Sequence, residues 1–269
     1  MIRRTLANTK AATFCVELVD IALLGMPAPA GTGFFVSADG WFITAAHVIT
    51  ENNQSDGPPR QDIDQAWLMQ ETRIDGNAPG GMCQHVSLGH ILPAFDIALL
   101  KVDFAANAQK EWLRPRSGFP HLTVSSRELD EGEPVYAFGY PLSGASAAPF
   151  SGGVSGTSSL CPRVTSAIVS STLEHSTMVM ASNDAKVYVL DKALNYGNSG
   201  GPIVSSDTGR VHAVCSRFQP LQLQQNHVKV SSGDPLVIVV PSLYGVVASL
   251  GNAAVLQLFG SLGIPVDGS

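Results

Sequence analysis

The stretch Gly197-Asn198-Ser199-Gly200-Gly201-Pro202 places one serine among three glycines, and the apolar pair Ile203-Val204 follows it. Glycine adopts positive φ without steric cost, so this composition predicts a tightly bent loop that presents the serine side chain. Glycines also leave the neighbouring backbone N–H groups open to an approaching ligand oxygen. We therefore take Ser199 as the candidate nucleophile of the chain.

The segment from Gly197 to Gly201 is compatible with two folds. It matches Gly-x-Ser-x-Gly, the nucleophile elbow of α/β-hydrolases, in which a strand precedes the serine and a helix follows it. It also matches the serine loop of an all-β protease. Asp207, His212 and His227 lie downstream and would fill the hydrolase order of serine, acid and histidine. The rest of the chain has to distinguish the two folds.

The composition is that of a globular protein with many turns. Of the 269 residues, 45% are apolar and 14% are charged, which suits a sizeable core and is too little charge for disorder. The 26 glycines and 17 prolines favour short strands over long helices. A net charge of −6 argues against a general nucleic-acid-binding role, because phosphate binding needs a basic surface.

The cysteines show no CxxC pair, so a zinc site is not expected, and we predict no metal and no other cofactor. In a chain of this length they do not make a disulfide framework either, and we interpret them as mostly buried free thiols. They are Cys15, Cys83, Cys161 and Cys215.

The N-terminal segment does not have the pattern of a signal peptide. Arg3 and Arg4 are basic, and Ala28-Pro29-Ala30 resembles a cleavage site. However, Glu17 and Asp20 interrupt the apolar region that a signal peptide requires. No apolar run approaches the ~20 residues that span a membrane. We therefore expect no membrane association and favour a cytoplasmic location.

Short apolar runs separated by turn residues recur along most of the chain, a pattern typical of β-barrels. Only the tail, residues 242–262, has apolar residues at helical spacing, with a break at Gly251. Surface loops are expected at 51–64 and 142–159, and a linker at 104–117. Strands are expected at 13–19, 31–37, 41–44, 66–69, 86–88, 95–102, 133–141, 164–173, 177–181, 186–191, 201–205, 210–217 and 236–241. Because Pro202 and a β-run follow Ser199, this pattern disfavours the hydrolase elbow.

Two further polar residues stand at the ends of apolar runs. His47 ends a hairpin and follows two alanines, which leave room around its ring. Asp96 enters a continuous apolar strand, where an unpaired charge would be costly. Alone, His47 would be interpreted as a satisfied core residue and Asp96 as a strand cap. Together with Ser199 they suggest a catalytic set.

Three segments, Thr44-Ala45-Ala46-His47, Asp96-Ile97-Ala98-Leu99-Leu100 and the Ser199 loop, resemble the His, Asp and Ser motifs of chymotrypsin-like (trypsin-fold) serine proteases, in that family's order. Gly31-Thr32-Gly33-Phe34 and residues 191–195 are similar to its Deg (high-temperature-requirement) branch. The resemblance implies an all-β fold of two six-stranded antiparallel β-barrels with a C-terminal helix. Residues 1–110 would form the first barrel, with His47 and Asp96, and residues 111–269 the second, with Ser199.

The resemblance also implies a chemistry, that of a serine endopeptidase acting on a polypeptide through an acyl-enzyme. His47 would be the base and Asp96 would orient it, while the N–H groups of Gly197 and Ser199 would form the oxyanion hole. The position six residues before the serine, at the base of the S1 pocket, is Ala193, and Ser216 and Arg217 would line the wall. This predicts a small or medium apolar P1 residue.

The sequence departs from the family pattern in three ways. Asn198 replaces the aspartate that pairs with a liberated N-terminus in digestive members, so we expect no activation of that kind. The paired cysteines around the histidine are missing. Only 70 residues (269 − 199) follow Ser199, and we expect no PDZ domain among them. These departures leave an alternative open, a latent or non-catalytic trypsin-fold module that acts through a regulatory protein partner.

Overall fold

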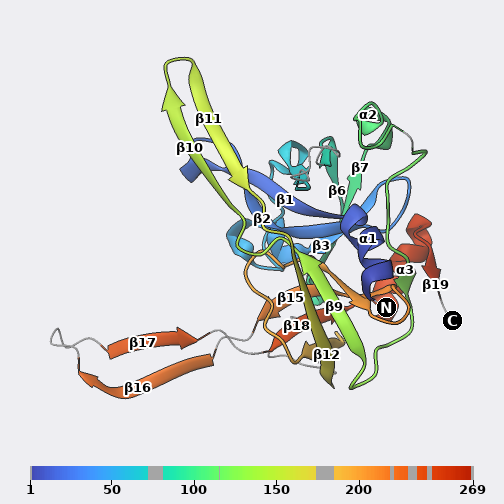
Figure 1. Cartoon of the computed structure of the whole chain (residues 1–269), viewed down its shortest axis with the longest axis vertical. Helices are drawn as coiled ribbons and strands as arrows, with labels where there is room; N and C mark the ends of the chain where they lie inside the picture. The colour runs from blue at the N-terminus through green and yellow to red at the C-terminus, as the bar shows by residue number, and fades with distance from the viewer. Residues whose placement is uncertain are drawn as a thin grey trace.

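The computed structural model describes residues 2–71, 81–114, 116–173, 185–218, 221–229, 235–240 and 244–267. Two mainly antiparallel β-sheets dominate it, and the helices are few and short (Figure 1). The predicted strand at 177–181 lies outside the described residues. Among the helices of the described ranges, none has the length and apolar character that a membrane crossing requires.

The first sheet has seven strands in the order β5-β4-β1-β2-β3-β7-β6 and curls into a half-barrel. Aromatic side chains fill its concave face: the Phe35 ring stacks on Phe119 at a centroid distance of 4.2 Å and meets Phe14 edge-on at 5.4 Å. The strands are β1 (Thr13–Asp20), β2 (Met26–Phe35), β3 (Trp41–Ala45), β4 (Trp67–Met69), β5 (Met82–Cys83), β6 (Val86–Leu92) and β7 (Ile97–Val102).

The second sheet closes on itself. Its order is β14-β9-β12-β13-β18-β15-β8-β19, and an additional β14–β15 pairing joins the first six of these positions into a barrel. The strands are β8 (Val124–Ser125), β9 (Pro134–Gly139), β12 (Arg163–Leu173), β13 (Val187–Leu190), β14 (Pro202–Ser205), β15 (Val211–Phe218), β18 (Gly245–Ser249) and β19 (Val266–Asp267). The prediction of an all-β trypsin-like fold is confirmed, with one closed six-stranded barrel and one half-barrel.

The two sheets share a hydrophobic core. One buried cluster contains Ile43 and Leu99 of the first sheet together with Tyr136 and Val204 of the second. The N-terminal helix α1 (Ile2–Ala12), which the sequence did not predict, packs on the second sheet, because Tyr136 Oη lies 2.9 Å from the hydroxyl oxygens of both Thr5 and Thr9. Residues of both sheets therefore have to come together before the core is complete.

The remaining helices are short. They are α2 (Phe104–Asn107), α3 (Ala253–Leu262) and the single 3₁₀ turns η1 (Ile21–Leu23), η2 (Ala46–Val48), η3 (Glu51–Asn53), η4 (Ile63–Gln65) and η5 (Pro93–Phe95). Two of these turns matter for the site, since η2 carries His47 and Asp96 is the C-cap residue of η5.

Two sequence predictions are wrong in detail. The expected loop at 142–159 is a hairpin of β10 (Gly144–Phe150) and β11 (Gly153–Ser159), which extends from the body at upper left in Figure 1. Its glycine, serine and alanine residues have low strand propensity, which hid it. The expected helical tail is divided: β18 is a barrel strand, and α3 begins only at Ala253. A short apolar run does not by itself distinguish strand from helix.

A second hairpin, β16 (Leu221–Lys229) and β17 (Pro235–Val240), extends at lower left in Figure 1. It follows β15 in the chain and precedes β18. The predicted strand at 236–241 is therefore confirmed as a strand, but its pairing partner is β16 and not the barrel.

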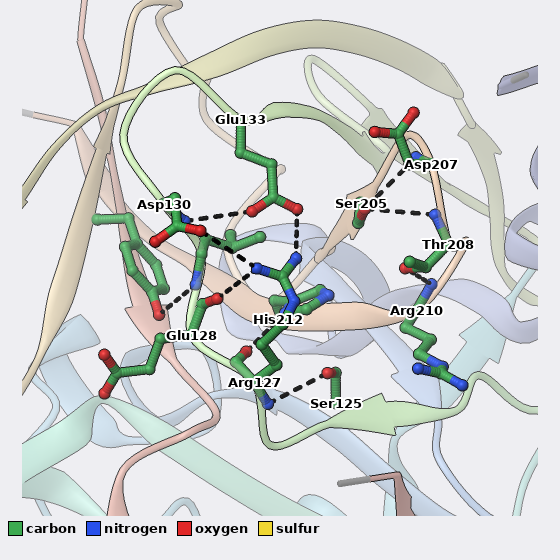
Figure 2. Close-up of polar contacts among 12 residues, drawn as sticks. Ser125, Arg127, Glu128, Asp130, Glu133, Ser205, Asp207, Thr208, Arg210 and His212 are labelled. Carbon is green, nitrogen blue, oxygen red and sulfur yellow. Dashed lines mark hydrogen bonds and ion pairs between the residues drawn. The ribbon is translucent and has the colours of Figure 1, made fainter. Parts of the chain in front are cut away.

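A polar cluster holds the turn before β9 against β15 (Figure 2). The Arg127 side chain forms an ion pair with Glu133. The backbone carbonyl oxygen of Arg127 accepts a hydrogen bond from Nδ1 of His212 at 2.8 Å. His212 is 1% exposed, and its other ring nitrogen, Nε2, has no hydrogen-bond partner among the described residues. Burial lowers the pKa of His212, because the charged ring would lose its hydration.

We predict that Phe35→Ala lowers the free energy of unfolding by about 3–5 kcal/mol, because it opens a cavity between the Phe14 and Phe119 rings. Urea denaturation monitored by fluorescence measures this loss. Ile21→Ala is the control, since that side chain is 90% exposed, and it should change stability by less than about 0.5 kcal/mol. Equal effects of the two substitutions would contradict the core assignment.

We also predict a pH dependence that His212 controls. Its folded-state pKa is depressed, so its contribution to stability is complete above the ordinary histidine pKa of about 6.5 and is lost as the pH falls below that value. Asparagine keeps a donor near the Nδ1 position but does not titrate. Chemical denaturation between pH 8 and pH 5 should therefore show a smaller loss of stability in His212→Asn than in the wild type. Parallel curves would show that the ring is not buried as a neutral group.

Candidate active site

A pocket of about 690 Å³ opens where residues of the two sheets meet. Pro29, Ala30, His47 and Asn53 contribute to it from the half-barrel side. Segments that follow β9, precede β14 and belong to β15 form the remaining walls. The lining residues are Pro29, Ala30, His47, Asn53, Tyr140, Leu142, Ser143, Leu194, Asn195, Tyr196, Gly197, Asn198, Ser199, Cys215 and Ser216.

Asp96 is fully buried beside His47. Its backbone is left-handed (φ 52°), a conformation that the short polar side chain of aspartate tolerates. This geometry aims the carboxylate at η2, where Oδ2 lies 2.8 Å and Oδ1 3.0 Å from Nδ1 of His47. The His47 backbone N–H also donates to Oδ1, at 3.0 Å. With Nδ1–H donating to the carboxylate, the imidazole keeps its lone pair on Nε2.

Ser216 supplies a third donor from the opposite sheet. Its hydroxyl donates to Oδ2 of Asp96 at 2.5 Å, and the side chain is 3% exposed. A carboxylate without water needs such donors, because an unpaired buried charge is costly. The sequence predicted Ser216 as a pocket residue. It does line the pocket, and it also fixes Asp96.

The Ser199 loop is bent as its glycines predict. Gly197 and Gly200 have φ of +93° and +85°. The turn is closed by the N–H of Asn198, which donates to Asn195 O at 3.0 Å, and by that of Gly201, which donates to Asn198 O at 2.8 Å. A Cβ atom at Gly200 would collide with the Thr32 carbonyl oxygen and the Thr44 hydroxyl, so only glycine fits there.

Two backbone donors in this loop are unoccupied. The N–H groups of Gly197 and Ser199 form no hydrogen bond with any residue of the described ranges, whereas those of Asn198, Gly200 and Gly201 are all paired. Both residues line the pocket. Unpaired N–H groups of pocket residues are available as hydrogen-bond donors to a ligand oxygen.

Ser199 and His47 line the same pocket, but their side chains form no hydrogen bond with each other in this structure. Hydrogen bonds between nucleophile and base are often long without substrate and tighten on binding. Asp96, by contrast, is already fully engaged. The His47 ring is therefore held by Asp96, whereas no hydrogen bond joins it to Ser199.

The other predicted pocket residues have different surroundings. Ala193 is partly exposed and is not among the lining residues, whereas its neighbour Leu194 is buried and lines the pocket. The side chain of Arg217 lies outside the described residues. The sequence analysis did not identify Thr32, Tyr140, Leu142 or Ser143 as site residues. Only Thr32 carried a signal, as the central residue of Gly31-Thr32-Gly33.

The hydrolase interpretation of the serine loop is excluded. His212 binds the Arg127 carbonyl (Figure 2) and is not among the residues that line the pocket. The N–H groups of Asp207 and Thr208 face the Ser205 hydroxyl in the turn after β14, and the Asp207 side chain is not in the pocket lining. The side chain of His227 lies outside the described residues. A strand, β14, and not a helix follows the serine.

Two known proteins are similar to this chain in sequence. Serine protease HTRA1 of Xenopus laevis is 28% identical over 184 residues, which are 68% of this chain and 30% of that protein. Serine protease HTRA2, mitochondrial, of Bos taurus is 26% identical over 219 residues, 81% of this chain and 35% of that protein. The chain thus spans about a third of the length of these relatives.

Solved structures agree on the fold. The HtrA-type protease AlgW, solved with a tripeptide, superposes with a TM-score of 0.58 at 18% identity, covering 98% of this chain and 65% of that chain. The family model described as a trypsin-like peptidase domain matches residues 31–214, which include His47, Asp96 and Ser199. Because this match extends over more than half of the chain, the protein belongs to the trypsin-like peptidase domain family.

Proposed function

We propose that the protein is a serine endopeptidase that hydrolyses polypeptides through His47, Asp96 and Ser199. The observation that carries this proposal is the buried Asp96–His47 pair, which opens on the same pocket as Ser199 and two unpaired N–H groups. The named relatives are serine proteases, which supports the same chemistry. Residues 1–110 contribute the base and its partner, and residues 111–269 contribute the nucleophile.

In the proposed reaction, Ser199 Oγ attacks the scissile carbonyl while Nε2 of His47 takes its proton. Asp96 holds the ring in the tautomer with a proton on Nδ1 and stabilises the imidazolium that forms. His47 then donates the proton to the leaving amine, and the acyl-enzyme remains. Water, deprotonated by His47, attacks the ester and releases the second product.

The N–H groups of Gly197 and Ser199 receive the carbonyl oxygen as it becomes an oxyanion. They need no reorganisation, since neither is engaged by the described residues. Loss of one such donor typically costs about 10²–10³ in kcat.

The pocket also supports a specificity. Leu194, Cys215 and Ser216 offer apolar or small surfaces, and no acidic residue is among the lining residues of the described pocket. A lysine or arginine side chain would find no carboxylate there. We propose that P1 is a small or medium apolar residue and that Leu194, which lines the pocket where Ala193 does not, contacts it.

The second candidate function is a latent or non-catalytic trypsin-fold module that acts through a protein partner. The missing hydrogen bond between Ser199 and His47 is the observation that favours it. Reactivity of the serine distinguishes the two candidates, because a fluorophosphonate labels only an activated hydroxyl.

We predict that Ser199→Ala and His47→Ala abolish fluorophosphonate labelling and lower kcat by about 10⁶, since nucleophile and base act as a unit. In-gel fluorescence and hydrolysis of reduced, carboxymethylated lactalbumin measure both effects. His212→Asn is the matched control and should keep full labelling, because its ring lies outside the pocket. Labelling of Ser199→Ala would contradict the assignment, and an unreactive wild type would favour the latent module.

We predict that a peptide library is cleaved after small or medium apolar residues such as valine. In Leu194→Ala the pocket is larger, so kcat/KM for phenylalanine relative to valine at P1 should rise by about tenfold, the lower end of what a change of a few methylene groups brings. Mass spectrometry of the cleaved library measures both preferences. A clear preference for lysine or arginine at P1 would refute the pocket assignment.

A further inference from the structure

Thr32 of β2 contacts the Ser199 loop with its side chain and its backbone. Its hydroxyl donates to the Gly197 carbonyl oxygen at 2.6 Å and accepts from the Tyr140 N–H at 3.0 Å. Its backbone N–H donates to the Ser199 carbonyl oxygen at 2.7 Å. The residue is 0% exposed, so no water competes for these hydrogen bonds. The carbonyl groups on both sides of Asn198-Ser199 are therefore held by one residue of the half-barrel.

Thr32 is itself fixed to the strand that leads to His47. The Thr44 hydroxyl of β3 donates to the Thr32 carbonyl oxygen at 2.7 Å, and three residues later the chain reaches His47. A Cβ atom at Gly31 would lie 2.9 Å from the Ser199 carbonyl oxygen, which shows how closely β2 approaches the loop. A continuous set of hydrogen bonds thus joins the strand that carries the histidine to the loop that carries the serine.

The loop also lacks an obvious charged anchor. Asn198, beside the serine, is 3% exposed, and its Oδ1 lies so close to Gly139 that a Cβ atom there would be 2.7 Å away. The asparagine side chain is a neutral amide, so it cannot fix the loop through an ion pair. Hydrogen bonds to carbonyl oxygens are consequently the main polar contacts that define this loop.

We propose that Thr32 is the positioning residue of the Ser199 loop. By holding the carbonyls of Gly197 and Ser199, it fixes the position of the N–H groups of these two residues and of the Ser199 hydroxyl relative to His47. The proposal rests on the peptidase function proposed above. Catalysis depends on the position of these groups relative to His47, since a displacement of about 1 Å can cost about 10²-fold in rate.

The test uses Thr32→Val, which removes the hydroxyl at nearly constant volume. Thr32→Ser restores the hydroxyl and serves as the rescue variant. Thr13→Val is the matched control for stability, because Thr13 is also 0% exposed, while its hydroxyl donates to Thr9 O at 2.7 Å, away from the pocket. Binding is measured with a peptide boronic acid, which forms a tetrahedral adduct on the serine, and with the corresponding peptide amide, which does not.

Thr32→Val should lower kcat about 10²-fold with little change in KM. It should weaken binding of the boronic acid by a similar factor and leave binding of the peptide amide unchanged. Thr32→Ser and Thr13→Val should behave as the wild type in all three measurements. An equal loss of kcat in Thr32→Val and Thr13→Val would show that Thr32 only stabilises the fold, and would overturn the proposal. Equal affinity of Thr32→Val and the wild type for the boronic acid would also overturn it.

Amide hydrogen exchange of residues 194–201 decides the proposal independently of activity. Faster exchange in Thr32→Val, but not in Thr32→Ser or Thr13→Val, supports the positioning role of Thr32. This holds even if the wild type does not react with the fluorophosphonate, a result that would contradict only the proposed peptidase function. Unchanged exchange in Thr32→Val overturns the positioning role whatever the activity. If Thr32→Val does not fold, Thr44→Val, which loosens the Thr32 carbonyl, should give a smaller change in the same direction.

Discussion

A carboxylate without access to water is the constraint on which the candidate site depends. Asp96 is 0% exposed, and a buried charge is tolerated only when donors surround it. His47 provides two of these donors, and Ser216 of β15 provides a third. Because the donors come from both sheets, satisfying this one side chain requires the half-barrel and the closed barrel to be assembled. The orientation of the His47 ring follows from the same contacts.

Close approach of backbones is the second constraint. The loop around Ser199 lies directly against β2 and β3, and Gly200 is the contact point, where a Cβ atom would strike Thr32 and Thr44. Gly197 has positive φ, and its N–H group and that of Ser199, two residues of the pocket lining, are unpaired among the described residues. The glycines around the serine thus allow close packing against β2 and β3 as well as the bend of the loop.

The rim of the pocket comes from segments with little sequence signal. Tyr140, Leu142 and Ser143 line it just before the β10–β11 hairpin, whose residues are small and largely exposed. Ser143 accepts from the N–H of Cys161 at 3.0 Å and donates to Tyr140 O, so it ties the two ends of the hairpin together. The hairpin therefore begins next to the pocket, and its other end is hydrogen-bonded to Ser143 of the pocket lining.

Local pattern alone predicted the all-β class, because short apolar runs between turn residues have few other solutions. It also drew attention to the loop of Ser199. His47 and Asp96 became candidates only through the resemblance of their segments to a protease family, because alone each would be interpreted as a structural residue. The α1 helix, the β10–β11 hairpin and the strand character of 245–249 were not predictable in this way, because contacts with distant segments decide them. Tertiary structure alone brought Ser216 to Asp96 and Thr32 to the Ser199 loop. These hydrogen bonds join residues 120 and 165 positions apart, and no local propensity encodes a partner at that distance.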